Sequence, residues 1–137
     1  MENNQNTFFI DGFEQELQKY IEIHSHSRDE VIYKLNLTDK AFNSLGIMDE
    51  GLLIALIDSY SSFASFLICK DKKQFSLSMN LKITSIDCLN KNNNYLMKVK
   101  ISDENKSFIL FDVNIVDKEG KLIKKASHFK KIVKPKF

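Results

Sequence analysis

The fold is decided by residues 51–69, which read GLLIALIDSYSSFASFLIC. Apolar residues recur there every three or four positions, as on one face of a helix of about five turns. This face contains Leu52, Leu53, Leu56, Ile57, Tyr60, Phe63, Ala64 and Leu67. The opposite face carries Ile54, Asp58, Ser61, Ser62, Ser65 and Cys69, without Lys, Arg or Glu. A helix face in bulk water usually carries long charged side chains, so we expect this helix to be covered on both faces.

The size of the chain limits what can cover this helix. One sheet covers one face, and a chain of 137 residues leaves little to cover the other. We therefore expect a homodimer, or a tetramer built as a dimer of dimers.

The helix is also nearly long enough to span a bilayer, but Asp58 and four serines make insertion costly. No membrane span is expected.

Strand patterns lie on both sides of the helix. Apolar and polar residues alternate over 31–37 before it, and over 75–83, 95–101 and 122–133 after it. Residues 108–116 are apolar on both faces at their start, which predicts a central strand. The loop from Asp117 to Gly120 predicts a hairpin in which Gly120 adopts positive φ. The last four strands are expected to form an antiparallel meander, which gives an α+β fold class.

The N-terminal segment has a different character. Apolar residues at helical spacing are Phe9, Phe13, Leu17, Tyr20 and Ile21. With Asp11 and Glu14 as a capping box, they predict a short helix. We therefore divide the chain into a polar segment with a short helix, residues 1–28, and one domain, residues 29–137. Since residues 1–7 show no signal or transit pattern, the cytoplasm is expected and the mitochondrion is left open.

The charge balance argues against one class of partner. Lys plus Arg number 20 and Asp plus Glu 18, so the net charge is +2 and nucleic acid is not an expected partner. Seven lysines and no acid occur in residues 121–137: Lys121, Lys124, Lys125, Lys130, Lys131, Lys134 and Lys136. They form either a solvated strand face or a site for an anionic ligand.

Asp58 is the candidate catalytic residue that the helix pattern leaves undecided. A carboxylate there could be satisfied by Ser hydroxyls and backbone N–H groups, or could act as a general base in a partly dry cleft.

The sequence gives weaker support to a metal site or a nucleophilic cysteine. His24 and His26 lack partners at metal-ligand spacing, so no metal is expected. No local motif supports a nucleophilic pair between a cysteine and His128.

The stretch NSLGIMDEGLLIALID, residues 43–58, resembles the signature of hot-dog-fold thioesterases of the phenylacetyl-CoA and acyl-CoA type. In that family Asn and Gly precede His-Gly-Gly and a helix that carries Asp. Residues 75–81 and 117–123 are similar to the family's second strand and last hairpin, and the resemblance extends over residues 29–133. It implies a sheet wrapped around a central helix, with dimers that join two sheets.

The resemblance also implies roles for individual residues. Asp58 matches the carboxylate that activates water, Ser76 the hydroxyl that orients it, and Asn43 the side chain that holds the thioester carbonyl. Asp58 and Ser76 would face Asn43 of a second subunit. The implied reaction is hydrolysis of acyl-CoA, with coenzyme A only as part of the substrate. Lys124, Lys130 and Lys131 are then candidate ligands of its phosphates.

One departure from the family pattern affects the expected activity. Asp49-Glu50-Gly51 stands where the family has His-Gly-Gly. Two acids at a helix N-terminus are ordinary partners of the helix dipole, but their charge is unfavourable near a thioester carbonyl. The backbone at Glu50 and Gly51 can still donate to that carbonyl. The alternative is a non-catalytic hot-dog protein that binds an acyl-CoA, a lipid or a protein in the same cleft.

Overall fold

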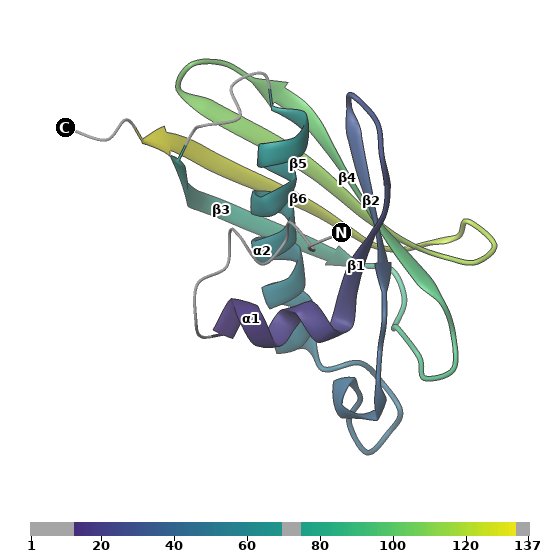
Figure 1. Cartoon of the computed structure of the whole chain (residues 1–137). Helices are drawn as coiled ribbons and strands as arrows, with labels where there is room; N and C mark the ends of the chain where they lie inside the picture. The colour runs from purple at the N-terminus through teal and green to yellow at the C-terminus, as the bar shows by residue number, and fades with distance from the viewer. Residues whose placement is uncertain (1–12, 70–74, 134–137) are drawn as a thin grey trace.

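A computed structural model describes residues 13–69 and 75–133 of the chain. Within these residues, a six-stranded antiparallel sheet curves around one long helix, α2 (Glu50–Ile68) (Figure 1). The α+β class and the helix wrapped by a sheet are therefore confirmed.

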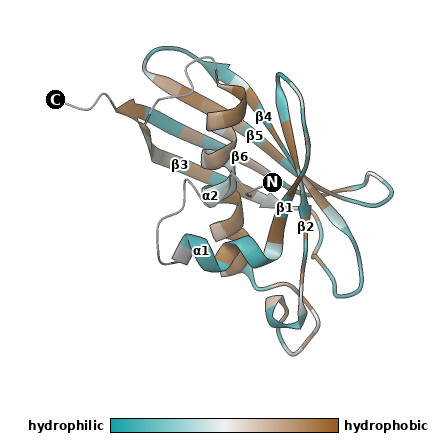
Figure 2. Cartoon of the chain, viewed as in Figure 1, coloured by the Kyte–Doolittle hydropathy of each residue, from teal (hydrophilic) through white to brown (hydrophobic). Residues whose placement is uncertain are grey.

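Helix α2 begins and ends close to the predicted positions. The Asp49 side chain caps its first turn by accepting the Leu52 backbone N–H at 2.9 Å, and the chain leaves the helical conformation at Cys69. Its apolar residues pack against the inner face of the sheet, and Figure 2 shows hydrophobic segments on α2 and on the strands behind it. The largest fully buried helix residues include Leu53, Leu56, Ile57 and Tyr60.

The spatial order of the strands differs from a simple meander. It runs β1 (Ile21–His26), β2 (Glu30–Leu35), β4 (Tyr95–Glu104), β5 (Phe108–Asp117), β6 (Leu122–Val133) and β3 (Phe75–Ser85). The prediction of four sequential neighbours is wrong for β3, which pairs with β6 at the edge. The connection after β3 is bonded to the segment before α2, where the Met48 N–H donates to the Leu89 carbonyl at 3.0 Å. This connection carries the chain across to β2, beside which β4 begins.

Two other strand predictions are confirmed. Strand β5 lies between β4 and β6 and is therefore central, as its two apolar faces indicated. Gly120 adopts φ of +82° in the hairpin between β5 and β6.

The N-terminal helix ends earlier than predicted. Helix α1 (Phe13–Leu17) and the 3₁₀ turn η2 (Gln18–Tyr20) end before Ile21, which starts β1 opposite Leu35. The alternation of Ile21 and Ile23 suits a strand, and pairing with β2 outweighs the helical spacing. Because Leu17 and Ile21 are each 1% exposed within the common core, the sheet and its core include residues before position 29. Phe9 and Asp11 lie outside the described residues.

The second face of α2 is covered in part by the chain's own sheet, while Ile54 is 45% exposed and the Asp58 side chain 49% exposed. Ser61 and Ser65 are buried, and Ser61 contacts His128 of β6. The polar strip of the helix therefore faces polar residues of β6, and it does not by itself require a second subunit. By length and composition α2 could also cross a bilayer, but half of that span is buried inside the protein, as in the core helix of a globular domain.

Candidate active site

A cavity of about 280 Å³ opens between α2, β3 and β6. Its lining residues are Glu14, Asp58, Ser59, Ser62, Ser76, Leu77, Ser78 and Lys130. Three of the residues singled out from the sequence, Asp58, Ser76 and Lys130, therefore lie in one cavity although they come from three different elements.

Asp58 is held at the cavity wall by β3 rather than by its own helix. Its side chain is 49% exposed, and its Oδ1 accepts a hydrogen bond from the Ser78 hydroxyl at 3.1 Å. Ser76 lines the same cavity, two residues along the strand. Because side chains alternate across a strand, Ser76 and Ser78 both point towards the helix. Ser76 was predicted from the sequence, whereas Ser78, which makes the direct contact, was not.

His128 lies behind Asp58 and is fully buried. Its Nδ1 is 2.6 Å from the Ser61 hydroxyl, its Nε2 is 2.7 Å from the Ser78 hydroxyl, and Nε2 is 3.5 Å from Asp58 Oδ1. From the sequence, His128 was a candidate only as the partner of a cysteine. The alternation of β6, which places Ala126, His128 and Lys130 on the inner face, was the signal that could have placed it here.

The environment keeps His128 neutral. Burial lowers its pKa to about 4, and the nearby Lys130 ammonium acts in the same direction, while Asp58 opposes them. Burial also lowers the pKa of Lys130, against the attraction of Asp58. Lys130 donates to the Ser62 hydroxyl, which in turn donates to the Asp58 backbone carbonyl at 2.8 Å. A neutral imidazole thus stands beside a carboxylate and an ammonium group.

This pKa predicts a stability change in acid. Because the folded protein disfavours the charged imidazole, the stabilisation is complete above pH 6.5 and is lost as the pH falls towards 4. The expected loss of unfolding free energy between pH 7 and pH 5 is on the order of 2 kcal/mol. Urea unfolding at several pH values measures it, and His128→Asn should flatten this slope. An equally steep slope in the variant would assign the effect to other groups.

Two candidate lysines are placed differently from Lys130. The Lys124 side chain is 3% exposed, and its ammonium donates to Glu50 Oε1 at 3.2 Å and to Ser85 Oγ at 2.8 Å. Lys131 is exposed and alternates with Lys130, so it lies on the outer face of β6. Lys134 and Lys136 lie outside the described residues. The lysine-rich segment is therefore divided between two faces of the strand.

Asn43 shapes the loop before α2. Its Oδ1 accepts the backbone N–H groups of Leu45 at 2.9 Å and Ile47 at 3.2 Å, while Gly46 adopts φ of +75°. Asn43 is exposed and is not among the residues lining the Asp58 cavity. Within one chain, the structure thus brings together Asp58 and Ser76 but not Asn43. Glu50 and Gly51 lie at the start of α2, next to Lys124.

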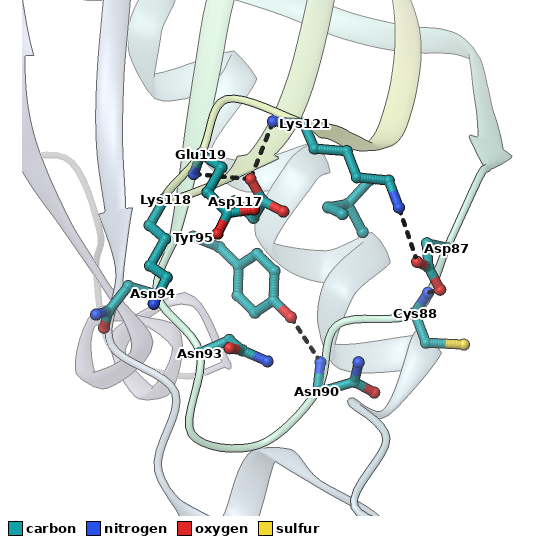
Figure 3. Close-up of a pocket in the computed structure, with 11 residues that line it drawn as sticks. Asp87, Cys88, Asn90, Asn93, Asn94, Tyr95, Asp117, Lys118, Glu119 and Lys121 are labelled. Carbon is teal, nitrogen blue, oxygen red and sulfur yellow. Dashed lines mark hydrogen bonds and ion pairs between the residues drawn. The ribbon is translucent and has the colours of Figure 1, made fainter.

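A second cavity, of about 140 Å³, lies between the loop after β3 and the hairpin between β5 and β6 (Figure 3). Its polar groups bond to each other: Lys121 pairs with Asp87 at 3.6 Å, and the Asn90 N–H donates to the Tyr95 hydroxyl at 2.8 Å. Asp117 accepts two backbone N–H groups of its own hairpin. The polar groups that line this cavity therefore stabilise the two loops.

Comparisons with known proteins place this geometry in context. No protein-family model and no curated protein matches the sequence. The structure is similar to that of thioesterase superfamily member 2 from Mus musculus, with 23% identity and a TM-score of 0.76 over 86% of this chain and 85% of that one. For the zebra fish protein of the same name the identity is 20% and the TM-score 0.79, over 89% and 87%.

A third similar structure holds a ligand. The Streptococcus mutans protein smu.793, bound to acetyl-CoA, has 15% identity and a TM-score of 0.73 over 85% of this chain and 91% of that one. At these identities the likeness concerns the fold alone.

Proposed function

We propose that this chain, which has the hot-dog fold of the thioesterase structures, hydrolyses acyl-CoA thioesters to the free acid and coenzyme A. The observation that carries the proposal is the cavity in which the Asp58 carboxylate meets the hydroxyls of Ser76 and Ser78. Similar folds that bind acetyl-CoA or coenzyme A support the choice of substrate.

The proposed chemistry needs a base, an oriented nucleophile and donors for the oxyanion. Asp58 takes a proton from water, and Ser76 orients the water in the cavity. The backbone N–H groups at Glu50 and Gly51, at the positive end of the α2 dipole, are the proposed oxyanion donors. Lys130 adds a positive charge at the cavity wall. Asn43 would complete the site from a second copy.

Exposed apolar side chains support the proposed dimer. Strand β3 is an edge of the sheet, and Phe75, Leu77 and Met79 on it are 63%, 61% and 57% exposed. An open edge of this kind pairs readily with another chain. We expect sedimentation equilibrium to show a dimer or tetramer at micromolar concentration, and Leu77→Lys to shift it towards the monomer. A monomeric wild type would remove the shared site and the role of Asn43.

The direct test is a panel of acyl-CoA esters of increasing chain length, followed by release of the free thiol. We expect turnover with at least one chain length. As a matched control, Asp103→Asn changes an exposed carboxylate on β4 and should leave turnover unchanged. Absence of thiol release across the panel would remove the enzymatic proposal.

The non-catalytic alternative is favoured by one observation. Glu50 lies at the start of α2, where the family that this sequence resembles has glycine. The Lys124 ammonium binds the Glu50 carboxylate at this position. In that case calorimetry would show that an acyl-CoA binds without being hydrolysed.

A further inference from the structure

Ser78 contacts a buried histidine, and this contact has no role if water attacks the thioester directly. It is an exposed residue whose hydroxyl lies at the wall of the Asp58 cavity. The same oxygen is 2.7 Å from Nε2 of the buried His128. Ser59, Ser62 and Ser76 line the cavity too, but within the described residues the hydroxyl of Ser78 is the one from this group that contacts the imidazole.

The contacts of Ser61 determine which nitrogen of His128 carries the proton. The Ser61 hydroxyl is 2.6 Å from the Ile57 carbonyl and 3.2 Å from the Asp58 carbonyl, and carbonyl oxygens can only accept. The single hydroxyl proton therefore points to the helix backbone. Ser61 Oγ must then accept from His128 at the 2.6 Å contact, so Nδ1 carries the proton. Nε2 is left as an acceptor, and the hydroxyl of Ser78 is the donor in reach at 2.7 Å. The single Ser78 proton is then shared between Nε2 and Asp58 Oδ1, with the longer contact of 3.1 Å to the carboxylate as the weaker branch.

We infer that Ser78 is a nucleophile that takes the acyl group from the substrate, with His128 as its general base. This inference rests on the proposed function for the identity of the acyl donor. A serine activated by a histidine whose tautomer is fixed by a third group is a recognised arrangement for acyl transfer. Here a serine hydroxyl bonded to the helix backbone fixes the tautomer.

The reaction balances in two steps. Ser78 Oγ forms a bond to the thioester carbonyl carbon while its proton passes to His128 Nε2. The carbon–sulfur bond then breaks, and the leaving thiolate takes that proton to give free coenzyme A and an acyl ester on Ser78. Water, deprotonated by Asp58, attacks the carbonyl carbon of this ester, and Ser78 Oγ leaves with the proton that Asp58 took from the water, which regenerates the free hydroxyl and the carboxylate. The sum is hydrolysis of the thioester.

The charged groups beside His128 favour both the transfer of the proton to Nε2 and its return to the leaving group. Asp58 Oδ1, 3.5 Å from Nε2, stabilises the imidazolium that forms during attack. Lys130 disfavours that imidazolium, which helps the proton to return to the leaving group, and its charge stabilises an oxyanion in the same cavity. Phe111, with its ring centroid 6.4 Å from that of His128, covers the imidazole from β5.

The test uses p-nitrophenyl butyrate, which acylates a reactive serine without requiring recognition of coenzyme A. We expect a burst of nitrophenolate of one equivalent per chain and the mass of one butyryl group on the peptide that contains Ser78. Ser78→Ala should reduce the burst rate by about 10² or more, and His128→Asn should do the same. Ser78→Cys should restore acylation, now as a thioester. Ser102→Ala, a change of an exposed serine on β4, should keep the full burst. The burst rate should also stay constant from pH 7 down to about pH 5 and fall as the pH approaches 4, because His128 becomes protonated around that pH.

The outcomes separate this inference from the proposed function. If acyl-CoA is hydrolysed and Ser78→Ala retains its kcat without any acylated wild type, water attacks directly and the inference is wrong. If Ser78 is acylated by the ester but no acyl-CoA is turned over, the nucleophile stands and the thioesterase proposal falls. Butyryl groups found on another residue would overturn the assignment to Ser78.

Discussion

Asp58→Asn is expected to lower kcat for the best acyl-CoA substrate by on the order of 10² or more, as is usual for loss of a general base. The amide can still accept the hydrogen bond that Ser78 donates, so the cavity wall should keep its shape. What is lost is the ability to take a proton from water. The effect should therefore appear in kcat and leave KM nearly unchanged. Steady-state kinetics with the free-thiol assay measures both quantities.

The same variant reports on Ser78. If an acyl ester forms on Ser78 and Asp58 activates the water that removes it, the Asp58→Asn protein should accumulate the acylated form during turnover. Intact mass measurement after an acid quench detects it, and Asp58→Asn combined with Ser78→Ala should not accumulate it. An Asp58→Asn protein with unchanged kcat would exclude the carboxylate from the mechanism.

Glu50→Gly is expected to raise kcat, because it removes a carboxylate from the region where the oxyanion forms and leaves room for the carbonyl at the backbone N–H. One good oxyanion donor contributes about 10² to 10³ in kcat, so even partial restoration should be measurable. Glu50→Gln separates the two causes, since it removes the charge and keeps the size. The full gain in Glu50→Gln would assign the effect to charge alone.

This variant should also be less stable, for a reason that the sequence did not reveal. The Lys124 ammonium is almost fully buried and, among residues 13–69 and 75–133, would keep only the Ser85 hydroxyl as a partner. Because Glu50 itself is 58% exposed, we expect a loss of about 1–2 kcal/mol, below the value for a fully buried pair. Adding Lys124→Met removes the unpaired charge and should recover most of this loss in urea unfolding. If the folded double variant has lower activity than wild type, the Glu50–Lys124 pair is a working part of the site.

Sequence alone determined the elements that depend on local periodicity. The helix at 51–69 and the strands from 75 onwards follow from the spacing of apolar residues, and the positive φ of Gly120 follows from its hairpin position. The wrong predictions also come from local periodicity. Helical spacing extended through Ile21, yet backbone pairing with β2 made that residue a strand. Local patterns contain no information about which strand is the neighbour, so the pairing of β3 with β6 was also missed.

The composition of the site was decided by tertiary structure. Asp58 and Ser76 could be singled out from the sequence because a resemblance supplied their spacing, and the structure places both on one cavity. His128 and Ser78 are 50 positions apart, and only the pairing of β3 with β6 brings the imidazole to the hydroxyl. Likewise, the lysine-rich segment appeared to be one positive patch. The period of two along a strand sends Lys130 inward to the cavity and Lys131 outward to solvent, because neighbouring side chains of a strand point to opposite faces.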